Sequence, residues 1–309
     1  MATKSIKNIK KEFHDNGIFY TPPELAKTYL DYIPFKPKRV YDPTCGQGNL
    51  LNIFDDDVEK YGQELYQDEL DKAYKNLKNF HGYCGNTLYD DGFKDEKFDC
   101  IVGNYPFSIK WQQFHDERFD VAPALAPNGK ADYAFILHML YHLSDDGVCV
   151  CMGFPGILYR GNKEGTIRQW LVDQNYIDRV VHIAGNTFED TKIATCILVL
   201  KKNKTTTDVI FEDKETNETK TVGIDEIRAN KYNLSVSSYI VKEIEKEVID
   251  PIQTEIDCET HVIEQLLHQF NMTKLAMGLM DRDDIYINFV QHVDKCVRDW
   301  MNAENIKPI

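Results

Sequence analysis

The sequence predicts an α/β protein with a doubly wound, mostly parallel sheet, and three observations support this fold. Short apolar runs alternate with helix-like stretches between residues 38 and 200, which is typical of a parallel sheet covered by helices on both faces. A glycine-rich turn follows the first of these runs, as at the ligand-binding strand ends of such sheets. Hydrophobic residues make up 42% of the 309 residues, enough for a sizeable core.

Six short apolar runs bounded by turn residues are the strand candidates. They are residues 39–41, 61–65, 98–103, 147–152, 179–183 and 195–200. Residues 67–79 and 132–143 predict helices, because their apolar residues recur at three- and four-residue spacing. The polar stretch 203–220, interrupted by the apolar residues 209–211, predicts a surface hairpin.

A change of character near residue 238 predicts the domain organisation. Residues 1–18 form a basic N-terminal arm, 19–238 the α/β core, and 239–309 a short helical C-terminal tail. Residues 255–280 and 285–301 read as amphipathic helices with no strand signal. These helices either dock a partner or a second copy of the chain, or simply pack on the core.

The net charge of −14 argues against a protein that grips DNA alone by bulk electrostatics, because phosphate contacts need Lys and Arg. Three basic clusters could supply a local grip or could be ordinary solvated surface. They are Lys4, Lys7, Lys10 and Lys11; Lys36, Lys38 and Arg39; and Lys201, Lys202 and Lys204.

The chain carries no run of the roughly 20 apolar residues that a membrane helix needs. Its N-terminus is polar and lacks an apolar signal-peptide core. We therefore expect a protein of the cytoplasm, in a bacterial or phage-infected host cell, with no membrane partner.

Eight cysteines occur without a C-x-x-C pair, so reduced, mostly buried cysteines are expected. His138 and His142 have the spacing of a metal pair on a helix. They lack the glutamate of an H-E-x-x-H motif, and no third ligand is evident. We therefore expect no metal site.

The glycine-rich turn at residues 42–51 follows the first strand candidate and opens a helix in this interpretation. Gly46 and Gly48 allow turn geometry and close approach of the backbone to a ligand. Glu64 follows about 20 residues later, where a carboxylate can accept hydrogen bonds from ribose hydroxyls. The alternative is an ordinary strand–helix turn.

Residues 104–107, Asn-Tyr-Pro-Phe, follow the apolar run 98–103 and so lie at the carboxyl end of a strand. The exocyclic amine of adenine is a poor nucleophile, and two hydrogen-bond acceptors on its N–H groups would return electron density to the nitrogen. The Asn104 side-chain oxygen and the Tyr105 backbone carbonyl can be these acceptors. Pro106 stiffens the loop, and Phe107 offers a face for a base turned out of the duplex. The alternative is a simple turn.

The order of these motifs resembles that of gamma-class adenine-N6 DNA methyltransferases, and most closely the modification subunit of type I restriction–modification systems. Phe-Tyr-Thr-Pro at residues 19–22 precedes the glycine-rich turn and then the tetrapeptide. Further similar segments are residues 131–135, 154–158, 164–170, 195–200 and 232–239. The resemblance covers roughly residues 17–240 and implies a Rossmann-like S-adenosylmethionine-dependent methyltransferase fold.

The resemblance also implies roles for individual residues. Thr21 is expected near the carboxylate of S-adenosylmethionine; Asp42, Cys45 and Gly46 at its methionine part; Glu64 at the ribose; and Leu65 at the adenine. The full set of expected cofactor-binding residues is Tyr20, Thr21, Asp42, Thr44, Cys45, Gly46, Gly48, Asn49, Glu64, Leu65, Asn86 and Thr87. The expected catalytic residues are Asn104, Tyr105, Pro106 and Phe107.

Three departures from the family pattern stand out. Tyr105 replaces a usual proline, although its backbone carbonyl survives the change. Asn86 stands where the family often has aspartate, so the acceptor for the cofactor's adenine amine is neutral and weaker. About 18 residues precede the core, where type I subunits usually carry a long helical domain, and no target-recognition domain is evident after it.

The leading hypothesis is therefore a methyltransferase acting on a flipped adenine in double-stranded DNA, dependent on a separate specificity subunit. One alternative is a non-catalytic module that binds the cofactor or modulates a restriction complex. Another is a methyltransferase acting on RNA or protein, although the Phe-Tyr-Thr-Pro motif ahead of the glycine-rich turn favours DNA.

Overall fold

The computed structural model describes residues 21–185 and 194–240, together with scattered helical positions between residues 260 and 299. The chain divides into two compact units, 1–242 and 243–309. Tyr239 and Ile240, at the predicted start of the tail, still pack into the core of the first unit. The predicted arm at 1–18 lies outside the described residues. No helix in the described part of the chain is long and apolar enough to cross a membrane.

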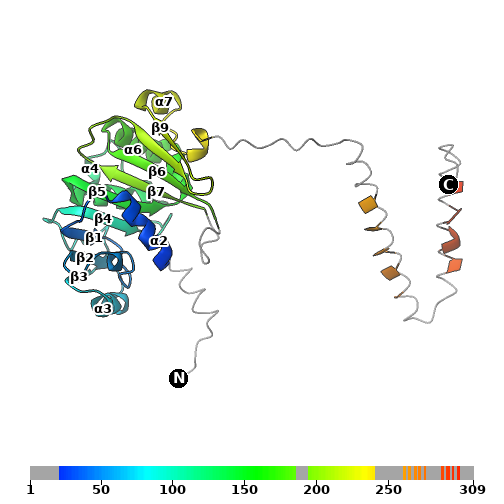
Figure 1. The fold of residues 1–309 in the computed structure, drawn as a ribbon, viewed down its shortest axis with the longest axis horizontal. Helices are drawn as coiled ribbons and strands as arrows, with labels where there is room; N and C mark the ends of the chain where they lie inside the picture. The colour runs from blue at the N-terminus through cyan, green and yellow to red at the C-terminus, as the bar shows by residue number, and fades with distance from the viewer. Residues whose placement is uncertain are drawn as a thin grey trace, which may run out of the picture. The chain divides into compact units, whose positions relative to one another are not determined.

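A nine-stranded sheet forms the first unit, with the order β3-β2-β1-β4-β5-β7-β6-β8-β9 (Figure 1). Its strands are β1 (Arg39–Asp42), β2 (Glu59–Glu64), β3 (Phe80–Cys84), β4 (Phe98–Asn104), β5 (Leu143–Gly153), β6 (Ile177–Ile183), β7 (Thr195–Lys201), β8 (Val209–Asp213) and β9 (Glu218–Val222). Strand β7 is antiparallel to both neighbours, and β9 is antiparallel to β8; the other neighbours are parallel. The predicted doubly wound, mostly parallel sheet is confirmed.

The helices complete two apolar clusters, one on each face of the sheet. The α-helices are α2 (Pro23–Thr28), α3 (Gln67–Asn76), α4 (Glu117–Asp120), α5 (Asp132–His142), α6 (Asn162–Asp173) and α7 (Ile224–Ala229). The 3-10 helices are η1 (Tyr29–Tyr32), η2 (Leu51–Ile53), η3 (Pro155–Leu158) and η4 (Val236–Ser238). Strand β5 shows the alternation that serves both clusters. Cys149 and Cys151 pack with α5, whereas Val148 and Val150 pack with α2.

The order of the strands creates a crevice beside β1. The chain runs outward from β1 through β2 to β3, and then crosses back to place β4 on the other side of β1. The loops that follow β1 and β4 therefore leave in opposite directions, which opens a crevice at the carboxyl ends of these two strands.

Several predicted boundaries were wrong for local reasons. The turn after β1 leads only into the short 3-10 helix η2 and opens no α-helix, because Phe54 is already extended. Helix α3 ends at Asn76, three residues early, because Leu77 turns extended and packs beneath the glycine-rich turn. Strand β3 was not predicted, since this edge strand is only partly buried and has no apolar run. Strand β5 begins at Leu143, four residues early, where its neighbour β4 carries a bulge.

The predicted hairpin is present but does more than cover the surface. Strands β8 and β9 pair antiparallel, while β8 also pairs parallel with β6 and so extends the sheet. Val209 and Phe211 are consequently buried in the core. The six described cysteines are free, and five of them are buried; Cys258 and Cys296 lie outside the described residues.

Candidate functional site

Two adjoining hollows lie at the crevice and share Thr44, Gly46 and Asn104 in their linings. The first extends over the ends of β2 and β3, between Glu64 and the loop after Asn104. The second reaches toward Thr21. The glycine-rich turn and the predicted catalytic loop therefore meet in one place, as their positions after β1 and β4 require.

The glycine-rich turn is braced by the carboxylate of Glu64. Gly46, at φ +52°, donates its N–H to Glu64 Oε2 at 2.9 Å, and Tyr66 donates its N–H to Glu64 Oε1 at 3.0 Å. Burial raises the pKa of Glu64 above its ordinary value, against these two hydrogen bonds. A carboxylate can accept about four hydrogen bonds and Glu64 lines the first hollow, so bracing and ligand binding are compatible.

Asp42 supplies a buried carboxyl to the second hollow. Burial raises its pKa to about 7; the hydrogen bond from the Thr44 backbone N–H, 2.9 Å from Asp42 Oδ1, lowers the pKa, and the nearby charge of Glu64 raises it. Its own neighbours therefore hold the carboxyl poised between its neutral and charged forms at neutral pH. A ligand with a positive charge in this hollow would favour the ionised form.

The side-chain amide of Asn104 has one satisfied end and one open end. Its Nδ2 donates to Thr21 Oγ1 at 3.0 Å. Its Oδ1 is buried without a hydrogen-bond partner. Buried polar atoms are rarely left unpaired. Such an atom on Asn104, which lines both hollows, indicates a place where a ligand supplies the missing partner.

The other three residues of the predicted tetrapeptide differ in their positions and contacts. Pro106 lines the first hollow. Tyr105 points into the core, where its ring stacks on Phe135 with centroids 5.2 Å apart. Phe107 lines neither hollow and instead packs edge-on against Phe154, at 5.7 Å between centroids. The side chain of Tyr105 is thus a packing group, and Phe154, from the segment 154–158 for which no individual roles were predicted, is the aromatic neighbour of Phe107.

Most of the predicted site residues line the two hollows. They are Thr21, Asp42, Thr44, Cys45, Gly46, Asn49, Glu64, Leu65, Asn86, Thr87, Asn104 and Pro106. Tyr20 lies outside the described residues. Gly48 does not line the hollows; at φ +87° it lies against Leu77, and a Cβ there would come within 2.5 Å of the Leu77 Cδ1 atom. Its role is close packing of the turn.

Asn86 and Thr87 shape the wall of the first hollow through hydrogen bonds inside the chain. Asn86 Oδ1, the predicted acceptor for the cofactor's adenine amine, accepts the Leu88 backbone N–H at 3.1 Å. The Thr87 hydroxyl donates to the Pro43 carbonyl and so ties this loop to the glycine-rich turn. Only the second lone pair of Asn86 Oδ1 remains available to a ligand.

Further residues that line the first hollow were not among the predicted site residues. Phe135 comes from helix α5, and the others lie outside the helices and strands: Tyr66, Tyr89, Ile109, Lys110 and Trp111. The Tyr89 hydroxyl accepts the Gln112 backbone N–H at 2.6 Å and so joins the loop after β3 to the loop after β4. The aromatic residues of these two loops come together only where the loops meet, so the sequence alone did not predict this wall of the first hollow.

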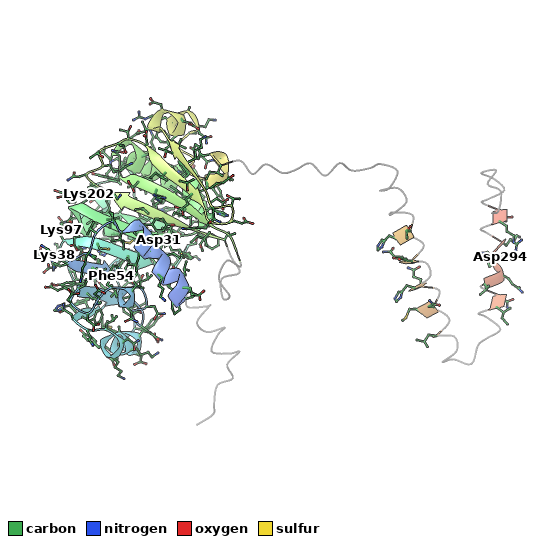
Figure 2. The ribbon with its side chains drawn as sticks, viewed as in Figure 1. Asp31, Lys38, Phe54, Lys97, Lys202 and Asp294 are labelled. Atoms are coloured by element: carbon green, nitrogen blue, oxygen red, sulfur yellow. The ribbon has the colours of Figure 1, made fainter. Side chains whose placement is uncertain are left out.

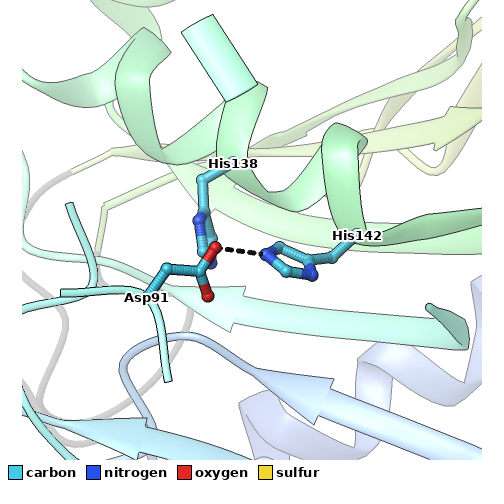
Figure 3. Close-up of side chains that lie close together, drawn as sticks. All are labelled: Asp91, His138 and His142. Atoms are coloured by element: carbon cyan, nitrogen blue, oxygen red, sulfur yellow. Dashed lines mark hydrogen bonds and ion pairs between the residues drawn. The ribbon is translucent and has the colours of Figure 1, made fainter. Parts of the chain in front are cut away.

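His138 and His142 meet a third potential metal ligand, Asp91, that the sequence analysis did not find (Figure 3). His142 Nε2 lies 3.0 Å from Asp91 Oδ2. The buried Arg118 places its Nη1 3.1 Å from His138 Nδ1 and 3.5 Å from Asp91 Oδ2. A guanidinium therefore already supplies the positive charge here. The expectation of no metal site stays a prediction.

Two of the predicted basic clusters lie on the edge of the sheet opposite the crevice. Lys38 and Lys97 precede β1 and β4, and Lys202 follows the antiparallel β7, so all three lie at that edge (Figure 2). Lysines of both clusters already have partners within the chain. Lys36 forms ion pairs with Asp55 and Asp57, and Lys202 donates a hydrogen bond to the Leu143 carbonyl. The lysines of the arm lie outside the described residues.

Comparison with known proteins gives a consistent picture. The family described as N-6 DNA Methylase matches residues 6–221. The methylase subunit of a type I restriction enzyme from Mycoplasma pneumoniae is 34% identical, over 76% of this chain and 55% of its own length. A second such subunit, from Methanocaldococcus jannaschii, is 28% identical over 61% of this chain and 38% of its own. The chain thus spans about half the length of these relatives or less.

Solved structures agree with the sequence comparison. The methyltransferase subunit of a type I restriction–modification system from Streptococcus thermophilus superposes with a TM-score of 0.66 at 32% identity, over 72% of this chain and 59% of the other. The fold is thus Rossmann-like, of the S-adenosylmethionine-dependent methyltransferase type. With a family match over most of its length, the chain belongs to the N-6 DNA methylase family.

Proposed function

We propose that the chain transfers a methyl group from S-adenosylmethionine to the N6 amine of adenine in DNA, together with a separate specificity subunit. The observation that carries the proposal is the unpartnered Oδ1 of Asn104, held in the crevice beside the glycine-rich turn. The M. pneumoniae relative is named as a methylase subunit of a type I restriction enzyme, which supports the same reading.

The residues present fit the proposed cofactor. Leu65, half exposed in the first hollow, would pack on an adenine ring. The spare lone pairs of Glu64 would accept from ribose hydroxyls. Asp42 in the second hollow would face the positively charged methionine part. When bound there, S-adenosylmethionine supplies an electrophilic methyl group on its sulfonium.

The catalytic loop would bind and orient the target amine. Asn104 Oδ1 accepts one N–H of the adenine amine, and the Tyr105 carbonyl accepts the other. Both acceptors are held before the base arrives, which is how an enzyme stabilises a transition state without reorganisation. Phe107 and Phe154 form an aromatic corner beside the loop, where a base turned out of the duplex can stack.

Exposed apolar residues in the helical tail support the proposal of a partner that recognises the DNA sequence. Met272, Leu275 and Ile287 are each more than half exposed, as apolar residues are when their contacts come from another protein. We assign these exposed residues of the tail to contacts with the specificity subunit or with a second copy of the chain. If a chain truncated at residue 242 still assembled with the specificity subunit and kept its oligomeric state, this assignment would be wrong. A cytoplasmic location stays a prediction.

The deciding experiment measures N6-methyladenine in unmethylated genomic DNA by mass spectrometry. The purified chain is incubated with S-adenosylmethionine, with and without the specificity protein of its host. We expect product with the partner present, a loss of at least about 100-fold in the Asn104→Ala variant, and no loss in Asn203→Ala, an exposed asparagine. Equal product from the Asn104→Ala variant, or methyl acceptance by RNA or protein instead of DNA, would contradict the proposal.

A further inference from the structure

Thr21 connects the second hollow with the catalytic amide. It precedes α2 and is 4% exposed. Its hydroxyl oxygen accepts Asn104 Nδ2–H at 3.0 Å, and its backbone carbonyl accepts Asn49 Nδ2–H at 3.1 Å. Thr21 and Asn49 both line the second hollow. One residue thus touches the proposed methionine site and the proposed base-binding amide together.

The orientation of the Asn104 amide matters because its two ends have opposite hydrogen-bonding character. With Nδ2 toward Thr21, Oδ1 can accept from an adenine amine. Turned over, the same side chain would present N–H donors to that amine and repel it. The two orientations have nearly the same shape, so packing alone does not choose between them.

The single proton of the Thr21 hydroxyl can make the choice. A hydroxyl donates one hydrogen bond and accepts up to two. If its proton pointed at Asn104, the turned-over amide would be satisfied as well. Within the described residues this proton has no acceptor, and Thr21 lines the second hollow. A carboxylate bound in that hollow would take the proton and leave the oxygen as a pure acceptor.

We propose that Thr21 is a positioning residue whose hydroxyl holds the Asn104 amide in the base-accepting orientation seen in the structure, and that an amino-acid carboxylate in the second hollow excludes the opposite orientation. Cofactor binding then prepares the acceptor for adenine before DNA binds. The inference rests on the proposed function for its substrates, but its structural part concerns only Thr21, Asn104 and a carboxylate.

The structural part is tested by hydrogen exchange of the Asn104 side-chain amide, followed by NMR on the full chain with 15N-labelled asparagine. The signal is assigned by its loss in Asn104→Ala. S-adenosylhomocysteine, which carries the carboxylate, should slow exchange of one Nδ2–H by about tenfold or more, because the Thr21 oxygen can then only accept, and the existing hydrogen bond from Asn104 opens less often. 5′-Methylthioadenosine, which lacks the amino-acid part, should not. Thr21→Val should abolish the slowing, and Thr21→Ser should keep it.

The kinetic part is tested with the specificity partner and saturating S-adenosylmethionine. Thr21→Val should lower kcat by about 10- to 100-fold, with little change in KM for DNA, and Thr21→Ser should restore kcat to within about threefold. Thr21→Val should add nothing in an Asn104→Ala background, because coupled residues are not additive. Thr28→Val, which removes a hydroxyl bonded locally to the Leu25 carbonyl, is the matched control and should leave kcat unchanged.

The two proposals fail in different ways. If the wild-type chain transfers no methyl group but the exchange pattern is as expected, the proposed function is wrong and the positioning role stands. If the wild type is active while exchange and kcat are the same in Thr21→Val as in the wild type, the positioning role is wrong. An effect of Thr21→Val confined to the KM for S-adenosylmethionine would also overturn it, because Thr21 would then only bind the cofactor.

Discussion

At the scale of single residues, backbone and side chain divide the work of the catalytic loop. Asn104 offers its side-chain oxygen to the crevice, whereas Tyr105 buries its ring against Phe135. The residue that departs from the usual family pattern is therefore anchored in the core. Its aromatic side chain stabilises the loop without occupying the site, which is why the departure leaves the proposed chemistry intact.

Asp42 makes cofactor binding depend on pH. Its pKa of about 7 in the free protein means that binding a cationic ligand beside it at lower pH requires release of a proton. The affinity for S-adenosylhomocysteine, which keeps the amino-acid ammonium, should therefore fall below pH 7, by up to about tenfold per pH unit. Asp42→Asn should bind weakly with a flat profile between about pH 5.5 and 7.5. Titration calorimetry across that range measures both curves, and parallel curves would refute the role of Asp42.

The Asp42 carboxyl also makes the free energy of unfolding depend on pH, but this dependence runs in the opposite direction to that of ligand binding. Its pKa in the fold lies above the ordinary 3.8, so the folded state binds the proton more tightly than the unfolded state does. The stability that it contributes is complete below pH 3.8 and is lost as the pH rises through about 7. A ligand that pairs with the carboxylate offsets this loss.

At the scale of elements, Arg118 on α4 holds the loop after β3 in place. Its guanidinium donates to the Thr87 carbonyl at 2.9 Å and the Leu88 carbonyl at 3.0 Å. It also pairs with Asp116 and approaches Asp91. Burial raises the pKa of Asp91, but the hydrogen bond with His142 and the nearby charge of Arg118 outweigh burial and lower the pKa to about 2. The wall of the first hollow therefore depends on a charged network beneath it.

Removing this arginine should destabilise the first unit strongly. Arg118→Met leaves Asp91 and two carbonyls without their buried partner, and the free energy of unfolding should fall by about 3–5 kcal/mol. Arg228→Met, at an exposed ion pair with Asp173, should change the free energy of unfolding far less, because solvent screens surface ion pairs. Urea unfolding followed by circular dichroism compares the two. Equal effects would show that the network under the loop contributes no more than a surface pair.

At the scale of the whole molecule, charge is distributed unevenly around the sheet. The chain is acidic overall, and two of the predicted basic clusters lie at the edge opposite the crevice. Lys110, in contrast, is exposed and lines the first hollow beside the catalytic loop. A phosphate approaching with the target base would meet this side chain. In the function that we propose, the partner supplies the remaining positive charge for DNA binding.

The salt dependence of DNA binding should separate the two edges. In the complex with the specificity protein, Lys110→Ala should weaken binding to all sequences alike and lower the slope of log affinity against log salt by about 1. Lys38→Ala, at the opposite edge (Figure 2), should leave the slope unchanged. Fluorescence anisotropy at several salt concentrations measures the slopes. A larger effect of Lys38→Ala would mean that DNA binds at the edge opposite the crevice, and it would contradict our proposal.

The sequence by itself determined the sheet and the chemistry at its strand ends. Buried strands, the glycine-rich turn, Glu64 and Asn104 each carry a local signal, because apolar runs and strand-end motifs depend on neighbouring residues. The partly buried edge strand β3 and the starts of β5 and β6 were not predicted, because their limits depend on the partner strands.

Only the tertiary structure decided how the residues cooperate. Thr21 reaches Asn104 across 83 positions, and Asp91 reaches His142 across 51. Nor does any pattern along the chain show that Phe154 meets Phe107, or that two basic clusters face away from the crevice. These relations depend on strand order and loop crossing. Side-chain periodicity records which face of an element is buried, and the packing of the whole core selects its distant partner.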